Sequence, residues 1–310
     1  MHLSARSFLF CLLSSALLAT SCSAGPPDRH SLVFGGLRRS YTLHVPETAP
    51  KDKPIPLVLA YHGSGGDGAN MAALTQFDAL ADREGFAVAY PDAVSKNWND
   101  GREVVSIFSQ VSNVNDVGFT EAVIKDIERQ RSIDPHRIYA TGFSNGGIFV
   151  HLLASKLSDR LAAIAPVGGG IAEPVAPNFK PTSPLSVFII HGMADPFVPY
   201  AGGDVDVSNN GRIIPTTQTI KLWTQRSTGT AKPQNGALPD KDPNDHCKVK
   251  WTRWAGAKSG PEVLLYSIEG GGHAWPGGPQ FMPVSVIGNV CQDFDATAAI
   301  WDFFKKHPKP

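Results

Sequence analysis

The chain has 310 residues with 28 basic and 28 acidic side chains, so its formal net charge is zero. This balance argues against a nucleic-acid-binding protein, which would carry a basic surface, and we expect no nucleic-acid partner. After the first two dozen residues no apolar stretch approaches the length of a membrane span, so we expect no transmembrane span. The remaining length suits one large α/β domain; it does not indicate an oligomeric state.

The first 24 residues have the three-part layout of a secretory signal. Arg6 supplies a positive charge, residues 8–19 form an apolar core, and residues 20–24 are small, as in a cleavage zone. We therefore predict a signal peptide over residues 1–24, a single folded domain over residues 25–310, and export to the periplasm or the extracellular space. Lipoprotein anchoring at Cys22 is the less favoured alternative, because Ala19 stands where such sites usually carry leucine.

Beyond this segment the apolar pattern predicts strands that alternate with helices. Residues 31–36 and 39–45 alternate in the manner of two antiparallel strands that open a sheet. Further strands are expected at 56–61, 86–91, 137–141, 160–166, 185–192 and 263–268, and helices at 70–84, 117–131, 146–154, 217–227 and 294–306. Asp116 is expected to cap the second of these helices. Alternating strands and helices imply a mostly parallel, doubly wound α/β sheet flanked by helices.

The most informative motif is the G-x-S-x-G sequence over residues 142–146, which lies between an expected strand and an expected helix. Strand, G-x-S-x-G and helix together are typical of a nucleophile elbow. The turn is so tight that only Gly142 and Gly146 fit two residues to either side of Ser144, and it holds the hydroxyl up at the end of the sheet. Ser144 is therefore the candidate nucleophile. The alternative is an ordinary glycine-rich turn, and Phe143 beside the serine is expected in the core.

The partners of such a serine follow it in the order Asp or Glu, then His. The expected strand at 185–192 leads into a loop with Asp195, and the strand at 263–268 leads into three glycines and His273. Both side chains would lie at the carboxyl ends of strands, where catalytic groups of open α/β sheets gather. Asp195 and His273 are thus the predicted acid and base, although either one alone could be an ordinary loop residue. Three other carboxylates fit the acid role badly because they precede the serine, namely Asp92, Asp100 and Asp116.

Acyl transfer also needs hydrogen-bond donors for the oxygen that becomes negative in the transition state. In an elbow one donor is the backbone N–H after the nucleophile, here Asn145, and the second comes from an early loop. The expected strand at 56–61 runs into a glycine-rich loop, whose backbone can approach a ligand closely. We assign the second donor to Gly63 or Ser64, with Ser64 preferred. A phosphate cradle is the weaker alternative, because the loop lacks the Gly-Lys-Ser/Thr ending of a P-loop.

Two segments, 93–110 and 202–214, fit the core poorly and are expected to shape the substrate pocket. Trp98 and Trp275 sit in loops, so either indole could stack on an aromatic or sugar ring of the substrate. His62 joins them as a candidate substrate-binding residue. The alternative, in which each tryptophan fills the base of its loop, agrees equally well with the sequence.

Together these motifs resemble those of the secreted polyhydroxybutyrate depolymerase and feruloyl esterase family of α/β-hydrolases, which includes acetylxylan esterases. The resemblance rests on residues 62–66, 142–147, 191–195 and 272–278, and it extends over roughly residues 35–305. It implies an α/β-hydrolase fold, to which we add the expectation of no separate lid domain. It also implies hydrolysis of carboxylic esters from plant cell walls or storage polymers, and we expect no metal or cofactor.

Two cysteines remain once the expected signal peptide, with Cys11 and Cys22, is removed. In an exported chain Cys247 and Cys291 are more typical of a disulfide than of two free thiols. Such a bond would close a loop that contains His273. Two buried thiols are the alternative, whereas a zinc site is disfavoured because His246 and the cysteines lack the usual ligand spacing.

We therefore predict a secreted serine esterase in which Ser144 forms an acyl-enzyme, His273 transfers protons and Asp195 orients His273. The expected substrate is a small or polymeric ester, with feruloyl or related hydroxycinnamoyl esters of xylan first and short-chain polyhydroxyalkanoates second. Acetylxylan is a further alternative. A prolyl-oligopeptidase-like peptidase is less favoured because a gating domain is absent, and a non-catalytic binding protein is disfavoured because all three predicted catalytic residues are present.

Overall fold

The computed structural model describes residues 28–205, 211–256 and 260–310. The expected signal peptide over residues 1–24 and the lipoprotein alternative at Cys22 lie outside the described residues, as does part of segment 202–214. Within the described ranges, no helix combines the length and the apolar character needed to cross a membrane.

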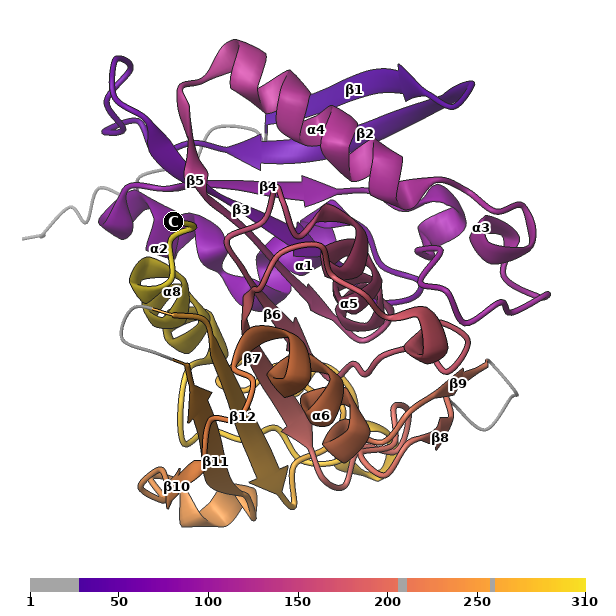
Figure 1. Cartoon of the computed structure of the whole chain (residues 1–310), viewed down its shortest axis with the longest axis vertical. Coiled ribbons are helices and arrows are strands. Elements are labelled where there is room, and N and C mark those ends of the chain that lie inside the picture. The colour runs from indigo at the N-terminus through magenta and orange to yellow at the C-terminus, as the bar shows by residue number, and fades with distance from the viewer. Residues whose placement is uncertain (1–27, 206–210, 257–259) are drawn as a thin grey trace, which may run out of the picture.

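A ten-stranded sheet runs through the molecule in the order β1-β2-β4-β3-β5-β6-β7-β12-β11-β10 (Figure 1). The six strands from β4 to β12 in this order pair in parallel, and the strands at both edges pair antiparallel. This arrangement confirms the mostly parallel α/β sheet and the antiparallel opening strands. The strands are β1 (Asp28–Phe34), β2 (Leu37–His44), β3 (Ile55–Tyr61), β4 (Ala87–Pro91), β5 (Ile133–Phe143), β6 (Ala163–Val167), β7 (Ser186–Gly192), β10 (Gln234–Ala237), β11 (Lys248–Ala255) and β12 (Glu262–Glu269). A separate short hairpin pairs β8 (Gly203–Asp204) with β9 (Arg212–Ile213).

Helices cover both faces of the sheet. Because side chains of a strand point alternately to its two faces, β3 places Leu57 and Leu59 in one core and Val58 and Ala60 in the other. The first core is covered by α4 (Asp116–Gln130), α5 (Asn145–Leu157) and α6 (Thr216–Ser227), and the second by α1 (Gly68–Thr75), α2 (Phe77–Glu84) and α8 (Ala296–Lys306) (Figure 1). Two further short helices lie in loops, α3 (Phe108–Val111) and α7 (Val284–Ile287), with 3-10 turns at Val94–Lys96, Ala176–Asn178 and Pro243–Asp245.

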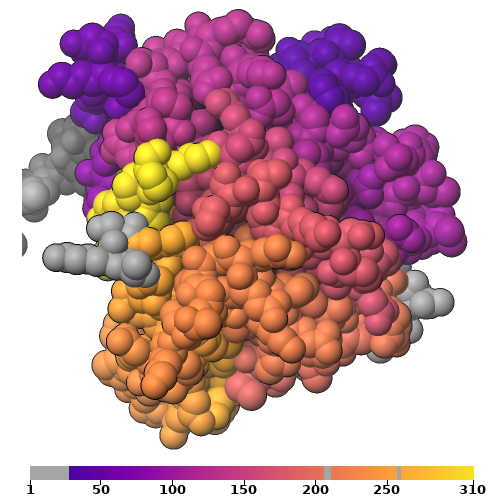
Figure 2. All heavy atoms as spheres, in the orientation of Figure 1, coloured from indigo at the N-terminus to yellow at the C-terminus, as the bar shows by residue number. Residues whose placement is uncertain are grey.

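The last residues of the chain fold back onto its middle. Trp301 on α8 donates its indole N–H to Glu84 at 2.9 Å, which joins α8 to α2. The Lys309 backbone N–H then donates to the His136 carbonyl at 2.7 Å, so the end of the chain lies against the start of β5 (Figure 2). Lys305 and Lys306 occupy the last turn of α8, where the helix dipole favours positive charge, as the sequence predicts.

Two details of the predicted helices are wrong. The single helix expected at 70–84 is two helices, because Gln76 adopts a left-handed conformation with φ of 54° and breaks the hydrogen-bond ladder. Asp116 does not cap α4; Asn115 does so by accepting the Gly118 N–H, and the Asp116 carboxylate instead binds Arg39 at 2.7 Å. The predicted cap was therefore one residue too late, because the Asp116 carboxylate is used in a tertiary contact with Arg39.

The parallel strands bring four loops to one edge of the sheet. Tyr61 at the end of β3 pairs with Gly142 near the end of β5, and Gly192 at the end of β7 pairs with Ile268 near the end of β12. The loops that follow these strands therefore begin at similar levels. They contain residues 62–66, Ser144, Asp195 and His273.

Candidate active site

Ser144 occupies the sharp turn between β5 and α5. Its φ of 57° and ψ of −120° are strained for a residue with a side chain, as a nucleophile elbow requires. The turn is closed by the Ser144 N–H, which donates to the Val167 carbonyl at 3.0 Å. A Cβ on Gly142 would lie 2.5 Å from the Gly146 carbonyl oxygen, and one on Gly146 would lie 2.3 Å from that of Tyr61. Only glycine fits at both positions, in agreement with the sequence prediction.

His273 and Asp195 meet at the same edge. His273 Nδ1 lies 2.7 Å from Asp195 Oδ2, and the other carboxylate oxygen accepts the N–H groups of Phe197 and Val198 at 2.8 Å each. The carboxylate is therefore held from both sides, and its orientation fixes that of the imidazole. Since Nδ1 faces Asp195, Nε2 is the nitrogen left for another partner.

The electrostatic setting keeps the Asp195 carboxyl ionised. Burial by itself would raise its pKa, but the contact with His273 and the hydrogen bond from Val198 hold the pKa below its ordinary value. Burial lowers the pKa of His191, whose Nε2–H donates to the Val198 carbonyl at 2.8 Å while Nδ1 lies 3.1 Å from the Thr216 hydroxyl. His191 is thus a neutral neighbour that supports the loop of Asp195.

Ser144 and His273 share the wall of a cavity of about 280 Å³. No direct hydrogen bond joins these two side chains in the described structure. The ring of Phe143, which we expected in the core, is buried but lines this cavity, with its centroid 4.8 Å from that of His273. The remaining lining residues are Gly63, Ser64, Arg102, Ile107, Asn145, Phe197, Val198, Val205, Phe281, Met282 and Ile287.

The Gly63–Ser64 peptide lies in the wall of this cavity. The Gly63 carbonyl accepts the His62 Nδ1–H at 2.7 Å and the Gly66 N–H at 3.1 Å. Because carbonyl and N–H point in opposite directions across a trans peptide, the Ser64 N–H points away from these two partners. Neither this N–H nor that of Asn145 has an acceptor in the described part of the chain. Both are thus available to a ligand in the cavity.

His62 supports the loop that contains the Gly63–Ser64 peptide. It is buried and does not line the cavity. Its Nδ1–H binds the Gly63 carbonyl, and its Nε2 accepts the Ala93 N–H at 3.1 Å. Burial lowers the pKa of His62, which favours the neutral ring that this pattern needs. Both ring nitrogens of His62 thus shape the loop, and a contact of His62 with substrate stays a prediction.

The two tryptophans expected either to stack on substrate or to fill the base of their loops are both buried. Trp98 is 0% exposed, and its indole stacks on Phe149 with centroids 5.1 Å apart. Trp275 is 2% exposed and donates its N–H to Thr297 at 3.0 Å. Neither lines the cavity. The burial of both rings agrees with the alternative in which each tryptophan fills the base of its loop.

The cavity walls contain residues that the sequence did not single out. Ile107 lies within the segment 93–110 expected to shape the pocket, and Val205 lies within 202–214. Phe197, Phe281 and Met282, however, were not foreseen. A long uncharged stretch after His273, residues 274–292, is the one sequence signal that marks Phe281 and Met282 as unusual.

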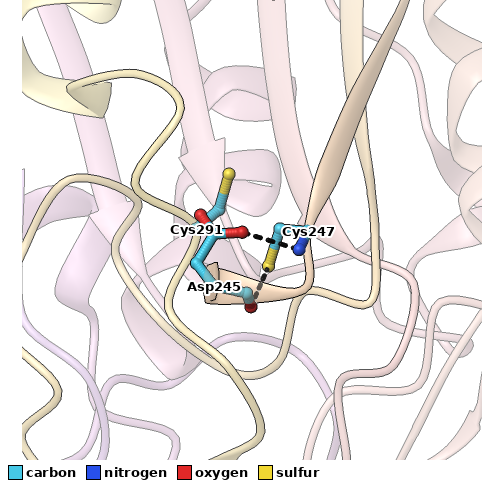
Figure 3. A group of neighbouring side chains, drawn as sticks. All are labelled: Asp245, Cys247 and Cys291. Carbon is cyan, nitrogen blue, oxygen red and sulfur yellow. Dashed lines mark hydrogen bonds between the residues drawn. The ribbon is translucent and has the colours of Figure 1, made fainter. Parts of the chain in front are cut away.

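The predicted disulfide between Cys247 and Cys291 is not formed in the structure, which has both residues as free, buried thiols. Their sulfur atoms and a carboxylate oxygen of Asp245 lie within 4.8 Å of one another (Figure 3). The neighbouring Cys291 thiol and burial raise the pKa of the Cys247 thiol far above its usual range. The Asp245 carboxylate holds the two segments together, since its oxygens accept the N–H groups of Cys247 and Gln292 at 2.6 Å each. Because both Asp245 oxygens accept backbone N–H groups, the cluster is better suited to joining the two segments than to binding a metal ion. The disulfide stays a prediction.

Comparison with known proteins shows that this chain is similar to esterases. The family model described as Esterase PHB depolymerase matches residues 39–209. NocK of Nocardia uniformis subsp. tsuyamanensis, which is named as a candidate esterase, is 30% identical over 281 residues that cover 88% of this chain and 80% of NocK. Feruloyl esterase B of Piromyces equi is 29% identical over 76% of this chain, which spans only 42% of that protein. Among solved structures, acetyl xylan esterase from Aspergillus awamori aligns with a TM-score of 0.50 at 16% identity, over 76% of this chain and 89% of the other. The structural likeness supports the α/β-hydrolase fold.

Proposed function

Because the chain belongs to the esterase PHB depolymerase family and is an ester hydrolase, we propose that it cleaves its substrate through a triad of Ser144, His273 and Asp195. The observation that supports this most is the 2.7 Å contact between His273 and Asp195 beside a serine on a strained elbow. Sequence order and geometry favour the same three residues.

In the proposed mechanism the Ser144 hydroxyl attacks the ester carbonyl while His273 Nε2 removes its proton. Asp195 keeps Nδ1 protonated and stabilises the imidazolium that forms. His273 then gives the proton to the leaving alcohol, which leaves an acyl group on Ser144. Water, activated by the same imidazole, releases the acid and restores the serine.

The negative oxygen of the tetrahedral intermediate is proposed to bind the N–H groups of Asn145 and Ser64. Both groups lack an acceptor in the described residues, and both residues line the cavity with Ser144. Backbone donors that are fixed before the reaction stabilise developing charge without reorganisation. Ser64 remains preferred over Gly63, because the Gly63 carbonyl is turned toward His62 and sets the direction of the Ser64 N–H.

For the acyl group we propose a hydroxycinnamoyl unit, such as ferulate linked to xylan, as the first candidate. The rings of Phe143, Phe197 and Phe281 surround the imidazole side of the cavity, with Phe143 and Phe281 centroids 6.2 Å apart. Aromatic walls of this kind favour a flat aromatic acyl group by offset and edge contacts. Acetylxylan would leave most of these walls without a contact.

A second candidate, a short-chain polyhydroxyalkanoate, is favoured by the surface around the cavity. Residues 104–115 and 274–292 contain no charged side chain and no histidine, and each contributes to the cavity wall. Seven of the ten exposed large apolar side chains of the described residues lie in these two segments: Val105, Phe108, Val111, Phe281, Met282, Val284 and Val286. Exposed apolar side chains in the two segments that contribute to the cavity wall suit an aliphatic ester better than a hydrated polysaccharide.

Export and the disulfide belong to the same proposal. Residues 1–24 read as a signal peptide, and an oxidising compartment would permit the bond between Cys247 and Cys291. A polysaccharide or polyester substrate outside the cell fits this location.

The proposed function is tested by kinetics on methyl ferulate, acetylated xylan, 3-hydroxybutyrate oligomers and a peptide amide, each with wild-type protein and Ser144→Ala. The proposal predicts the highest kcat/KM on methyl ferulate and a loss of several orders of magnitude in the variant. Preference for 3-hydroxybutyrate oligomers would select the second candidate. Preference for the amide, or full activity of Ser144→Ala, would overturn the proposal.

A further inference from the structure

The side chain of Asn145 is clasped by the loop that follows β4. Its Oδ1 accepts the Trp98 N–H at 2.8 Å, and its Nδ2 donates to Asp100 Oδ2 at 2.6 Å and to the Trp98 carbonyl at 3.2 Å. Asn145 is 2% exposed, so water does not compete for these bonds. The residue that offers a backbone N–H to the cavity is thus fixed through its side chain.

Asp100 supplies the charged end of this clasp. Its carboxylate is 0% exposed and accepts four hydrogen bonds. Oδ2 accepts from Arg102 Nε at 2.8 Å in addition to Asn145, and Oδ1 accepts from the Arg102 N–H at 3.1 Å and Gln110 Nε2 at 3.0 Å. A buried carboxylate with every acceptor site filled is rigid, because any movement would break bonds that water cannot replace.

The same loop also holds the second donor. The Trp98 indole N–H donates to the His62 carbonyl at 3.0 Å, immediately before the Gly63–Ser64 peptide. Trp98 therefore contacts the Asn145 side chain with its backbone and the early loop with its ring. The two backbone donors, which come from distant parts of the chain, are joined through residues 98–100.

We propose that Asp100 is a positioning residue of the oxyanion hole, which acts through the Asn145 side chain to aim the Asn145 backbone N–H at the reacting oxygen. This inference rests on the proposed function. Asp100 itself does not touch the substrate. A donor displaced by a fraction of an ångström stabilises the transition state less, whereas ground-state binding in the cavity depends on other contacts.

Asp116 offers a matched control. Like Asp100, it is a buried carboxylate paired with a buried arginine, Arg39, and it binds the same loop by accepting the Asn99 N–H at 2.8 Å. Burial raises the pKa of both carboxyls. Asp116 differs in that its carboxylate makes no contact with Asn145 in the described structure. Asp100→Asn and Asp116→Asn should therefore destabilise the fold to a similar degree but differ in catalysis.

The test measures kcat, KM and the affinity for a boronic acid transition-state analogue in Asp100→Asn, Asp116→Asn and Asn145→Ala, with the melting temperature as a check of folding. We expect kcat to fall about 100-fold in Asp100→Asn with little change in KM, and analogue affinity to fall with it. Asn145→Ala keeps the backbone N–H but lacks the clasped side chain, so it should show the same loss. The double variant should lose no more than either single variant, because both remove one interaction.

Equal kcat in Asp100→Asn and Asp116→Asn, or wild-type kcat in Asn145→Ala, would overturn the inference. If Asp100→Asn does not fold, Asn145→Ala decides the question alone. Ser144→Ala separates this outcome from a failure of the proposed function. An active Ser144→Ala would refute the triad, whereas an inactive Ser144→Ala together with an unaffected Asn145→Ala would refute only the role of Asp100.

Discussion

His273 Nδ1 lies 2.7 Å from Asp195 Oδ2, although 78 residues separate the two in the sequence. The contact arises because β7 and β12 are parallel neighbours whose carboxyl ends lie side by side, and each residue stands in the loop just after its strand. The pairing of two strands thus sets the distance between two catalytic candidates.

Asp195→Asn should lower kcat by about 10⁴-fold, because an amide would favour the wrong tautomer of His273. Stopped-flow or steady-state kinetics on the preferred ester would measure this effect. The neighbouring His191 provides the control. His191→Gln removes a neutral ring that supports the loop, so it should reduce stability more than kcat. Activity of Asp195→Asn close to wild type would mean that another carboxylate is the acid.

Acidification should lower the rate of the wild-type enzyme, since protonated His273 cannot accept the serine proton. The fall should be reversible and should precede unfolding, which circular dichroism at each pH would establish. A rate that stays constant until the protein unfolds would contradict a histidine base.

A serine-directed phosphonate should label Ser144 alone. The other serine on the cavity wall, Ser64, does not lie on an elbow, and its hydroxyl donates to Asn97 Oδ1. Peptide mapping by mass spectrometry after labelling would identify the site, with Ser64→Ala as the control that keeps full labelling. Modification at any serine other than Ser144 would argue against the elbow as the nucleophile.

The three triad candidates could be predicted because each has a local signal. Ser144 lies in a short motif between an apolar strand and a helix, and Asp195 and His273 each follow a strand that is recognisable from its apolar run. Chain order then adds information, since the three residues occur in the order expected of the fold. At Ser144, Asp195 and His273 the local sequence pattern and the order of the residues in the chain therefore favour the same assignment.

The contact between Asp100 and the Asn145 side chain could not be predicted, because it has no local signal in the sequence. Asp100 and Asn145 are 45 residues apart and meet through a loop without regular structure. The same reason explains why the sequence could not decide between the two alternatives for Trp98, since burial of a single ring in an irregular loop leaves no periodic pattern. Strand β11 was also missed, although Lys248 and Lys250 alternate with Val249 and Trp251 in the pattern of a half-buried strand.

Glu262 gives a prediction for stability against pH. Burial by itself would raise the pKa of this carboxyl, but hydrogen bonds and charges from His307 and Arg253 lower it from 4.5 to about 2. A carboxyl whose pKa is lower in the folded protein stabilises the fold at pH values above its pKa in the unfolded chain. This contribution is lost as the pH falls through its pKa in the folded protein. Glu262→Gln should thus cost about 1 kcal/mol at neutral pH, a modest amount because Arg253 is 41% exposed and solvent screens the pair.

Urea unfolding at neutral pH and at about pH 2 would test this expectation, and the difference between variant and wild type should disappear at the lower value. Glu269→Gln at the other end of β12 is the control, since Glu269 binds the exposed Lys250 and should change stability little. An equal difference at both pH values would show that Glu262 acts through packing and not through its charge.

The last prediction is a disulfide between Cys247 and Cys291, whose backbone segments are joined by the Asp245 carboxylate. In protein exported through its own signal, we expect Cys247 and Cys291 to be joined, which closes a loop that includes His273. The chain-entropy argument gives a stabilisation of about 4 kcal/mol for a loop of this length if the bond is unstrained. Cys247→Ser, Cys291→Ser and the double variant should therefore lose similar amounts of thermal stability while retaining most of their turnover on small esters. Non-reducing peptide mapping of the native protein measures the bond directly, and two thiols that alkylate freely without reductant would refute it.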